Sequence, residues 1–125
     1  MKSESKLYKK FKQNTPKILW TRLESWASFG VPDLLGYNNL CGFFMVELKF
    51  TQSNKIKFSP HQILFHTTRN ERNFILVEQA LRASQSTLKL FSSSEINNLI
   101  IGIDKAAPLA ADDFKLIEKI LINQK

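Results

Sequence analysis

Gly30-Val31-Pro32-Asp33-Leu34-Leu35-Gly36 and Phe43-Phe44-Met45-Val46-Glu47-Leu48-Lys49-Phe50 are the two stretches that decide the fold. Both are apolar enough to form strands, and turn-forming residues lie between them, so they are predicted to make an antiparallel hairpin. Each stretch nevertheless carries an acid. Burying an unpaired carboxylate costs several kcal/mol, so the charges of Asp33 and Glu47 need compensation. A divalent cation would provide it.

Strand alternation divides the second stretch into two faces. One face is entirely apolar and must lie in the core; it comprises Phe44, Val46, Leu48 and Phe50. The other face begins apolar and ends charged, at Glu47 and Lys49. Only these last two positions leave the core, as at the rim of a sheet where a cleft opens.

The turn between the two strands decides which residues face each other. If the turn is centred near Leu40, Asp33 stands opposite Glu47, with Cβ atoms about 4.5–5.5 Å apart. A two-residue turn at 38–39 would pair Asp33 with Phe44 instead. In the first register, two carboxylates can hold one cation between them, and oxygen ligands select Mg²⁺ or Mn²⁺ over Zn²⁺.

Two further groups on the second strand fit this chemistry. The backbone carbonyl of Leu48 lies between the two charged side chains and offers a third oxygen. Lys49 can hold or help deprotonate an attacking water, or neutralise charge that grows on a phosphate. Together these groups predict metal-assisted phosphodiester hydrolysis. Glu-x-Lys alone is a common pattern that is usually an ordinary ion pair, so the prediction depends on the surrounding sequence.

Composition sets the frame for this site. A chain of 125 residues is expected to be one domain, residues 1–125. Hydrophobic residues make up 43% and charged residues 23%, as in a folded globular protein. The formal net charge of +7 favours a polyanionic partner through phosphate contacts, although many basic proteins bind no nucleic acid.

Cysteine content and the N-terminus point to a reducing compartment. Cys41 is the only cysteine, so no intramolecular disulfide is possible. The first residues lack the apolar segment of a signal peptide, and no apolar run reaches membrane-spanning length. We therefore expect a cytoplasmic protein with no membrane association.

Periodicity and capping residues predict the remaining elements. Helices are expected over 3–13, over 16–27 with Thr15 and Pro16 as its start, over 60–70, from a cap at 92–95 to 101, and over 112–122. Strands are expected over 73–78 and, near the sheet edge, over 87–91. The strand, helix and strand from 43 to 78 imply a parallel crossover. The fold class is α/β, with a mixed central sheet flanked by helices.

Four short motifs now stand in order along the chain: Arg22-Leu23-Glu24, Gly30-Val31-Pro32-Asp33, Glu47-Leu48-Lys49 and Ser59-Pro60-His61-Gln62. In this combination the chain resembles the PD-(D/E)XK nuclease superfamily. It resembles most closely the VRR-NUC-like and phage Holliday-junction-resolvase-like branch. The likeness runs from Arg22 to about Val77, over a third of the chain.

The resemblance implies a restriction-endonuclease-like core of helix, three-stranded meander, helix and strand. It makes Asp33 and Glu47 the metal ligands, Lys49 the catalytic lysine and Glu24 an additional acid near the metal. It also points Gln62 into the active site. No third meander strand is obvious between residues 50 and 59.

Several of these residues also have ordinary structural interpretations. Glu24 is compatible with an exposed ion pair to Lys17 or Arg22. Gln62 is the third residue of a capping box with Ser59, and the two roles are expected to exclude each other unless its amide turns away from the cap.

Four basic or polar residues are predicted to contact nucleic acid. His66 and Arg69 follow Gln62 at helical spacing, where they would face bound nucleic acid or simply form a solvated helix face. Lys55 and Lys57 lie in the polar loop before this helix.

The predicted function is a Mg²⁺-dependent DNA endonuclease, with Mn²⁺ able to substitute. A branched or junction DNA is the expected substrate, cut by a homodimer, because a two-fold dimer presents two matched active sites to a symmetric junction. The alternatives are a nuclease of another specificity, such as a restriction-like, homing or flap-cutting enzyme, and a non-catalytic nucleic-acid-binding domain.

Overall fold

The computed structural model describes residues 3–23, 30–82 and 85–123. These residues form an α/β structure around one mixed six-stranded sheet, whose strands lie side by side in sequence order. The strands are β1 (Leu19–Arg22), β2 (Leu34–Asn38), β3 (Gly42–Thr51), β4 (Asn73–Arg82), β5 (Gln85–Ser92) and β6 (Ala110–Ala111). All neighbours pair antiparallel except β3 and β4, which are parallel as the predicted crossover requires.

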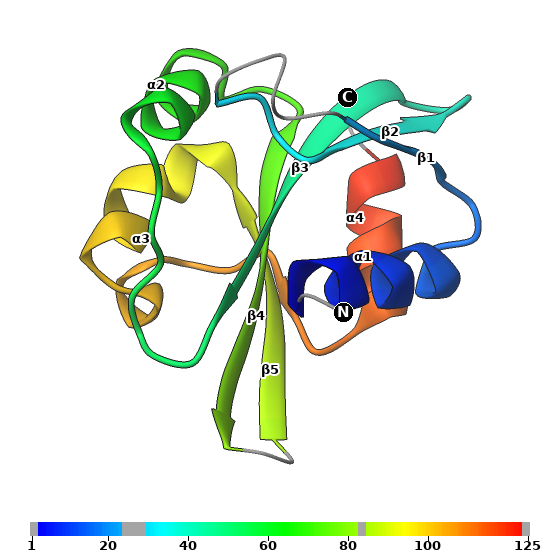
Figure 1. Ribbon diagram of the computed structural model, residues 1–125. Helices are drawn as coiled ribbons and strands as arrows, with labels where there is room; N and C mark the ends of the chain where they lie inside the picture. Colours follow the sequence, from blue (N-terminus) through cyan, green and yellow to red (C-terminus); the bar gives the residue numbers. More distant parts are fainter. Residues whose placement is uncertain (1–2, 24–29, 83–84, 124–125) are drawn as a thin grey trace.

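Helices cover both faces of the sheet (Figure 1). One face carries α1 (Ser3–Asn14) and α4 (Phe114–Ile122), and the other carries α2 (Pro60–Thr68), α3 (Ile96–Ile101) and two short 3₁₀ turns, η2 (Ser93–Glu95) and η3 (Ile103–Lys105). The predicted mixed α/β class is confirmed. The expected helices and strands near 3–13, 43–50, 60–70, 73–78, 87–91 and 112–122 are present within a few residues, although β6 rather than β5 ends the sheet.

The helix predicted over 16–27 is wrong for the part that the structure describes. Thr15 does not begin a helix, because its hydroxyl donates back to the carbonyl of Phe11 (2.7 Å) and accepts from the Trp20 indole (2.9 Å). The chain then forms strand β1, in which Leu19 is 71% exposed rather than buried. β1 completes an antiparallel meander with β2 and β3, so the third meander strand precedes the hairpin instead of following it.

The register of the β2–β3 hairpin is the one centred on Leu40. The ladder runs from Asn38 opposite Gly42 to Leu34 opposite Val46. A two-residue turn at 38–39 is therefore excluded. Asp33 precedes Leu34 in the chain and Glu47 follows Val46, so both acids lie just beyond the last pair of this ladder.

Two apolar clusters, one on each face, hold the layers together. The cluster under α1 and α4 is the larger; its largest members include Leu7, Phe11, Leu34, Phe44, Leu48, Leu76, Leu90, Ile117 and Leu121. The buried thiol of Cys41 belongs to it. The cluster under α2 and α3 comprises Ile56, Ile75, Val77, Phe91, Ile96, Leu99 and Ile103. None of the helices in the described residues is long and apolar enough to cross a membrane.

Candidate active site and metal centre

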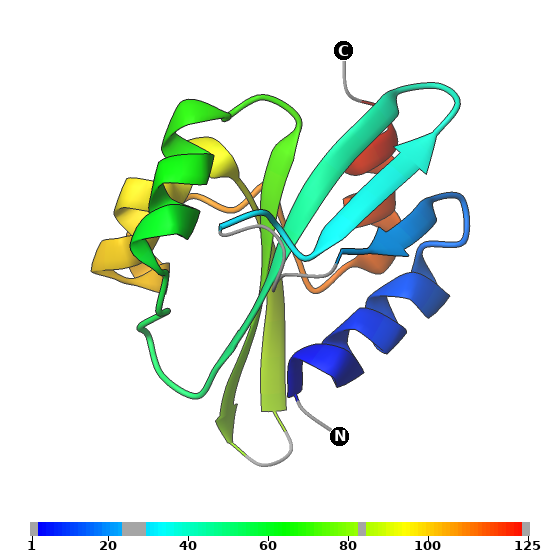
Figure 2. The ribbon, with the colours of Figure 1, turned by 45° about the horizontal axis from the view of Figure 1, so that its top comes forward.

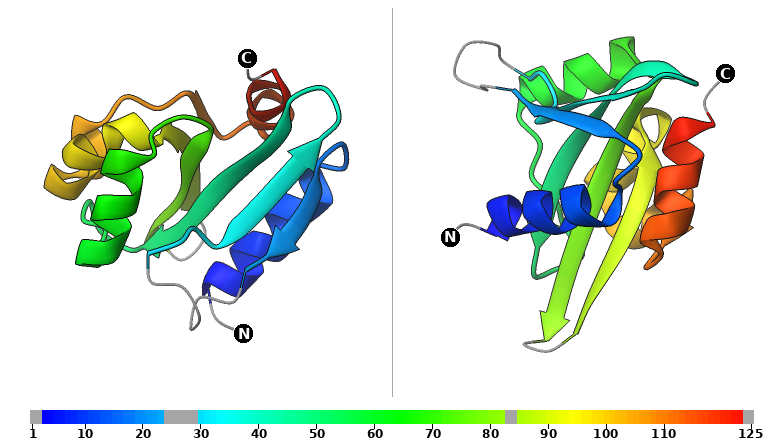
Figure 3. Two further views of the ribbon diagram at one scale, coloured as in Figure 1. Left: turned by 90° about the horizontal axis from the view of Figure 1, so that it is seen from above. Right: turned by 90° about the vertical axis from the view of Figure 1, so that its right-hand side faces the viewer.

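The candidate site lies where β2 and β3 diverge (Figure 2). β2 leaves β3 at the Leu34–Val46 pair, while β3 continues beside β4 as far as Thr51. From Glu47 onward, β3 therefore has a strand partner on one side only, among the described residues. This half-open edge lies between the start of α1 and the start of α2 (Figure 3, left).

Asp33 is fixed at this edge by the chain on either side of it. Gly30 adopts a left-handed conformation (φ +77°) and its Cα lies against the backbone of His61, where a side chain would clash. The Asp33 carbonyl accepts from the amide of Leu23 (2.8 Å), and its carboxylate accepts from the amide of Leu48 (2.8 Å). The amide and carbonyl of one strand residue point to the same side, so the Leu48 carbonyl also faces the open edge.

Glu47 is buried in the centre of the site, with 2% of its surface exposed. One carboxyl oxygen, Oε2, accepts from the Gln62 side-chain amide (3.0 Å), whereas Oε1 has no hydrogen-bond partner. Burial, followed by the charge of Asp33 and a hydrogen bond between the two carboxyl groups, raises the pKa of Glu47 to about 9; the charge of Lys49 opposes this shift. The two predicted acids therefore lie close enough to interact, and burial keeps Glu47 protonated at neutral pH.

Gln62 connects Glu47 to Lys49 and still completes the helix cap. Its carbonyl oxygen accepts from the ammonium of Lys49 (3.0 Å) and from the amide of Ser59 (3.0 Å), while its NH₂ group donates to Glu47. The cap and the contact with Glu47 coexist because the carbonyl oxygen of Gln62 completes the cap while its NH₂ group turns away from the cap to Glu47. The Lys49 ammonium also donates to the carbonyl of Lys57 (2.8 Å).

His66 does not lie on the outer face of α2, where it was predicted. Its side chain is completely buried, and its Nδ1 is 2.6 Å from the hydroxyl of Ser93 in η2. Its Nε2 lies 3.6 Å from Glu47 Oε1, and neither atom has a hydrogen-bond partner. Burial and the nearby Lys49 charge lower the pKa of His66 to about 4, so the imidazole is neutral. It belongs to the interior of the site rather than to a nucleic-acid surface.

Glu24, the predicted helix acid, lies outside the described residues. Glu4, on the first turn of α1, is an acid near the site that sequence reasoning missed. Its charge contributes to the raised pKa of Glu47, and it lines a groove of about 440 Å³ together with Lys49, Lys55 and Lys57. Glu4 is the only acid among the lysines of this helix, which is the one sequence signal that marked it.

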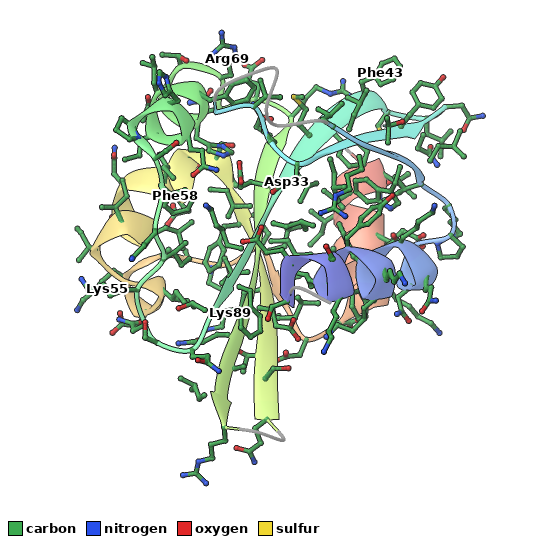
Figure 4. All side chains as sticks on the ribbon, viewed as in Figure 1. Asp33, Phe43, Lys55, Phe58, Arg69 and Lys89 are labelled. Atoms are coloured by element: carbon green, nitrogen blue, oxygen red, sulfur yellow. The ribbon has the colours of Figure 1, made fainter. Side chains whose placement is uncertain are left out.

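The predicted nucleic-acid contacts do not gather at one place, and Figure 4 shows Lys55 and Arg69 well apart. Lys55 is exposed beside α3 and donates to the carbonyl of Ile101 (2.5 Å). Lys57 is also exposed, whereas Arg69 lies beyond the end of α2 with its guanidinium over the Phe65 ring (4.6 Å). Lys55 and Lys57 thus share a groove with Lys49, and Arg69 does not line it.

The donor set at the edge fits a hard divalent cation. It consists of two carboxylates, one of them with an unpartnered buried oxygen, and the backbone carbonyl of Leu48. Within residues 3–23, 30–82 and 85–123, no three His, Cys, Asp or Glu side chains gather closely enough to hold a metal by themselves. Mg²⁺ does not need them, since it usually binds through one or two carboxylates and keeps several waters.

Comparison with known proteins does not supply a further argument. No family model matches the chain, and no curated protein matches it.

Proposed function

We propose that this protein is a Mg²⁺-dependent DNA endonuclease with a restriction-endonuclease-like core. The observation that carries the proposal is the meeting of Asp33, Glu47 and Lys49 at the half-open edge of β3, in the predicted register. The order of helix, three-stranded meander, helix and parallel strand in the first two thirds of the chain supports it, because the sequence resemblance implies that order.

The burial of Glu47 beside Asp33, which raises the pKa of Glu47 so that it keeps its proton, supports a cation at this point. Two neighbouring carboxyl groups, one of them buried, are not both ionised without a compensating charge. In the metal-free protein the proton compensates it, and Mg²⁺ would replace that proton. Asp33, Glu47 and the Leu48 carbonyl would hold the ion, and Mn²⁺ would occupy the same oxygen ligands.

The reaction assigned to the site is hydrolysis of a phosphodiester bond. A bound Mg²⁺ would lower the pKa of its water and stabilise charge on the phosphate. Gln62 orients Glu47 through Oε2 and holds the Lys49 ammonium through its carbonyl oxygen. Lys49 then directs an N–H toward the attacking water or the phosphate, where its positive charge stabilises the transition state.

The substrate part of the proposal rests on charge and symmetry. A net charge of +7 favours nucleic acid, and Lys55 and Lys57 line the groove that also contains Lys49. We propose branched DNA as the substrate and a homodimer as the active form, since a two-fold dimer matches a symmetric junction. A cytoplasmic location accompanies this function.

A cleavage assay on four-way junction, flap, duplex and single-stranded DNA tests the proposal. The wild-type protein should cut only with Mg²⁺ or Mn²⁺. Asp33→Ala and Lys49→Ala should each lower the rate by about 10²–10³-fold, as removal of a charge-stabilising group does in other enzymes. Lys115→Ala, an exposed lysine on α4, is the matched control and should cut normally.

Three outcomes separate the parts of the proposal. Cleavage that survives both Asp33→Ala and Lys49→Ala contradicts the mechanism. Cut flaps beside intact junctions retain the mechanism and reject the branched substrate that we favour. DNA binding with no cleavage of any substrate, with either metal, rejects the enzyme in favour of a nucleic-acid-binding domain.

A further inference from the structure

A second basic groove begins where the groove at the candidate site ends. It has a volume of about 680 Å³ and lies between α1 and the strands β4 and β5. Phe50, at the end of β3, lines both grooves. Figure 3 (right) shows β4 and β5 extending beyond α1 and α4, so these two strands form a wall that the helices do not cover.

The cationic groups of this groove come from distant parts of the chain. Lys6 and Lys10 are four residues apart and so share one face of α1, and Arg82 ends β4 on the opposite wall. Glu78 is the acid in the lining. It binds the Lys10 ammonium (2.7 Å) and accepts from the hydroxyl of Ser86 (3.2 Å), which holds this lysine in place while its other N–H groups remain available.

We propose that this groove binds the sugar–phosphate backbone of a nucleic acid that continues from the candidate active site. Lys6, Lys10 and Arg82 would contact phosphates on one side of Phe50, and Lys55 and Lys57 would contact them on the other. Cations from α1, from β4 and from the loop before α2 line two grooves that share Phe50, and this spread along the surface fits an extended polyanion better than a small anion. This inference rests on the proposed function only in taking nucleic acid as the ligand.

Metal-free binding measures this contact independently of cleavage. Fluorescence anisotropy with a labelled 20-base-pair duplex in EDTA, over a range of salt concentrations, should show weaker binding for Lys6→Ala/Arg82→Ala by about tenfold near 0.1 M salt. The slope of log K against log salt should fall by roughly two, since two phosphate contacts are lost. Lys115→Ala/Lys119→Ala removes the same charge from α4 and should leave the slope unchanged.

Equal losses of DNA affinity and of salt dependence in the two double variants would contradict the proposed groove contact, because such losses would reflect net charge alone. An unchanged slope for Lys6→Ala/Arg82→Ala would also overturn it. If the expected slope difference appears but no substrate is cut, the groove stands and the nuclease proposal fails. If cleavage depends on Lys49 but the slopes agree, only the groove fails.

A separate observation concerns the buried pair of His66 and Ser93. Both side chains are completely buried, and the Ser93 hydroxyl lies 2.6 Å from His66 Nδ1. When this hydroxyl donates to Nδ1, the imidazole proton is on Nε2, which faces the unpartnered Oε1 of Glu47 at 3.6 Å. Gln62 holds the other oxygen of the same carboxylate.

We infer that His66 and Ser93 are positioning residues that orient the Glu47 carboxylate for the metal. At 3.6 Å the His66 imidazole contacts Glu47 without a hydrogen bond in the metal-free protein, and groups that orient a metal ligand from its far side typically change metal affinity by 10–100-fold. The inference rests on the proposed function, because it takes Glu47 as a metal ligand.

Calorimetric titration of the metal-free protein with Mn²⁺ tests this role without cleavage. His66→Leu should weaken Mn²⁺ binding by about tenfold or more, and Ser93→Ala should weaken it less. His66→Gln should restore most of the affinity, since its amide nitrogen can donate from the place of Nε2. Ile96→Val, a mild change in the same apolar cluster, is the control for packing and should bind Mn²⁺ normally.

The outcomes distinguish this role from the metal site itself. Wild-type protein that does not bind Mn²⁺ rejects the proposed metal centre. Normal binding by His66→Leu, or no difference between His66→Leu and His66→Gln, rejects the positioning role alone. Circular dichroism of each variant establishes that the protein titrated is folded.

Discussion

The two faces of the sheet differ in what they bury. Under α1 and α4 the sheet buries the larger apolar cluster, and the polar residues buried on that side, Thr15, Glu78 and Glu118, all have hydrogen-bond partners. Under α2 and α3 it buries a smaller apolar cluster beside Glu47, His66 and Ser93, where Glu47 Oε1 and His66 Nε2 have no hydrogen-bond partner. β3 contributes to both, with Leu48 on the first face and Glu47 on the second. The face under α1 and α4 therefore provides most of the hydrophobic stability, while the face under α2 and α3 holds polar groups whose burial costs stability.

The largest expected effect on stability comes from the apolar face. Phe11 is completely buried and packs beside the rings of Trp20 (centroids 4.8 Å apart) and Phe114 (6.3 Å). Phe11→Ala should lower the free energy of unfolding by about 3–5 kcal/mol, because it removes buried surface and leaves a cavity. Urea denaturation measures the change. A loss below about 1 kcal/mol would show that this face is not the main source of stability.

A smaller effect of the opposite sign is expected on the polar face. Glu47 keeps its proton in the folded protein up to pH 9 or so but loses it near pH 4.5 in the unfolded chain. The folded state therefore binds more protons in between, and the free energy of unfolding of the metal-free protein falls as pH rises. The wild-type protein should lose about 2 kcal/mol of stability between pH 7 and 8.5, at roughly 1.36 kcal/mol per pH unit, and Glu47→Gln should remove this slope and be the more stable protein at pH 8.5.

Denaturation of the metal-free protein between pH 7 and 9 isolates this contribution. The pKa of His66 is lowered in the folded state, so this residue affects stability in a different pH range. It lowers the free energy of unfolding only below about pH 6.5, where the imidazole takes up a proton in the unfolded chain but not in the folded protein. A wild-type protein whose stability is constant or increases from pH 7 to 9 would contradict the burial of a protonated Glu47.

The smallest expected change in stability comes from removing a helix cap, and each face of the sheet offers one such cap. Ser59 accepts from the amide of Gln62 at the start of α2 (3.1 Å), and Asp113 accepts from the amide of Leu116 at the start of α4 (3.0 Å). Ser59→Ala and Asp113→Ala should each cost about 1 kcal/mol of stability in thermal unfolding. Only Ser59→Ala should also weaken Mn²⁺ binding, because Gln62 holds Glu47; equal Mn²⁺ affinity in the two variants would contradict that link.

Local sequence patterns predicted a helix or strand correctly where the tertiary contacts of the segment favour the same structure. The apolar alternation of residues 43–50 predicted the strand and its two faces, and of the two turns left open the structure has the one centred on Leu40, which brings Asp33 toward Glu47. The region after Thr15 failed because Ser, Thr and Pro mark a helix start by local chemistry alone. The Thr15 hydroxyl instead bonds to Phe11, and neighbouring strands draw residues 19–22 into the sheet.

The residues of the candidate site also divide into those that the sequence predicted and those that it did not. Asp33, Glu47, Lys49 and Gln62 were found from the sequence because each lies in a short motif. Glu4 was missed, since nothing in a lysine-rich helix indicates that its first turn packs near a strand edge more than forty residues away in sequence. His66 was misplaced because a nine-residue helix with weak amphipathic character gives little indication of which side is buried.

The sequence by itself determined the fold class and the presence of two acids and a lysine in neighbouring strand segments, because strand alternation acts between residues close in the chain. Only the tertiary structure decided between the two possible hairpin registers, and only it showed that Glu47 lies against His66, that Glu4 lies near it, and that two basic grooves meet at Phe50. These arrangements depend on where β2 leaves β3 and on how helices pack across the sheet. Packing of that kind joins residues whose separation in sequence carries no local signal.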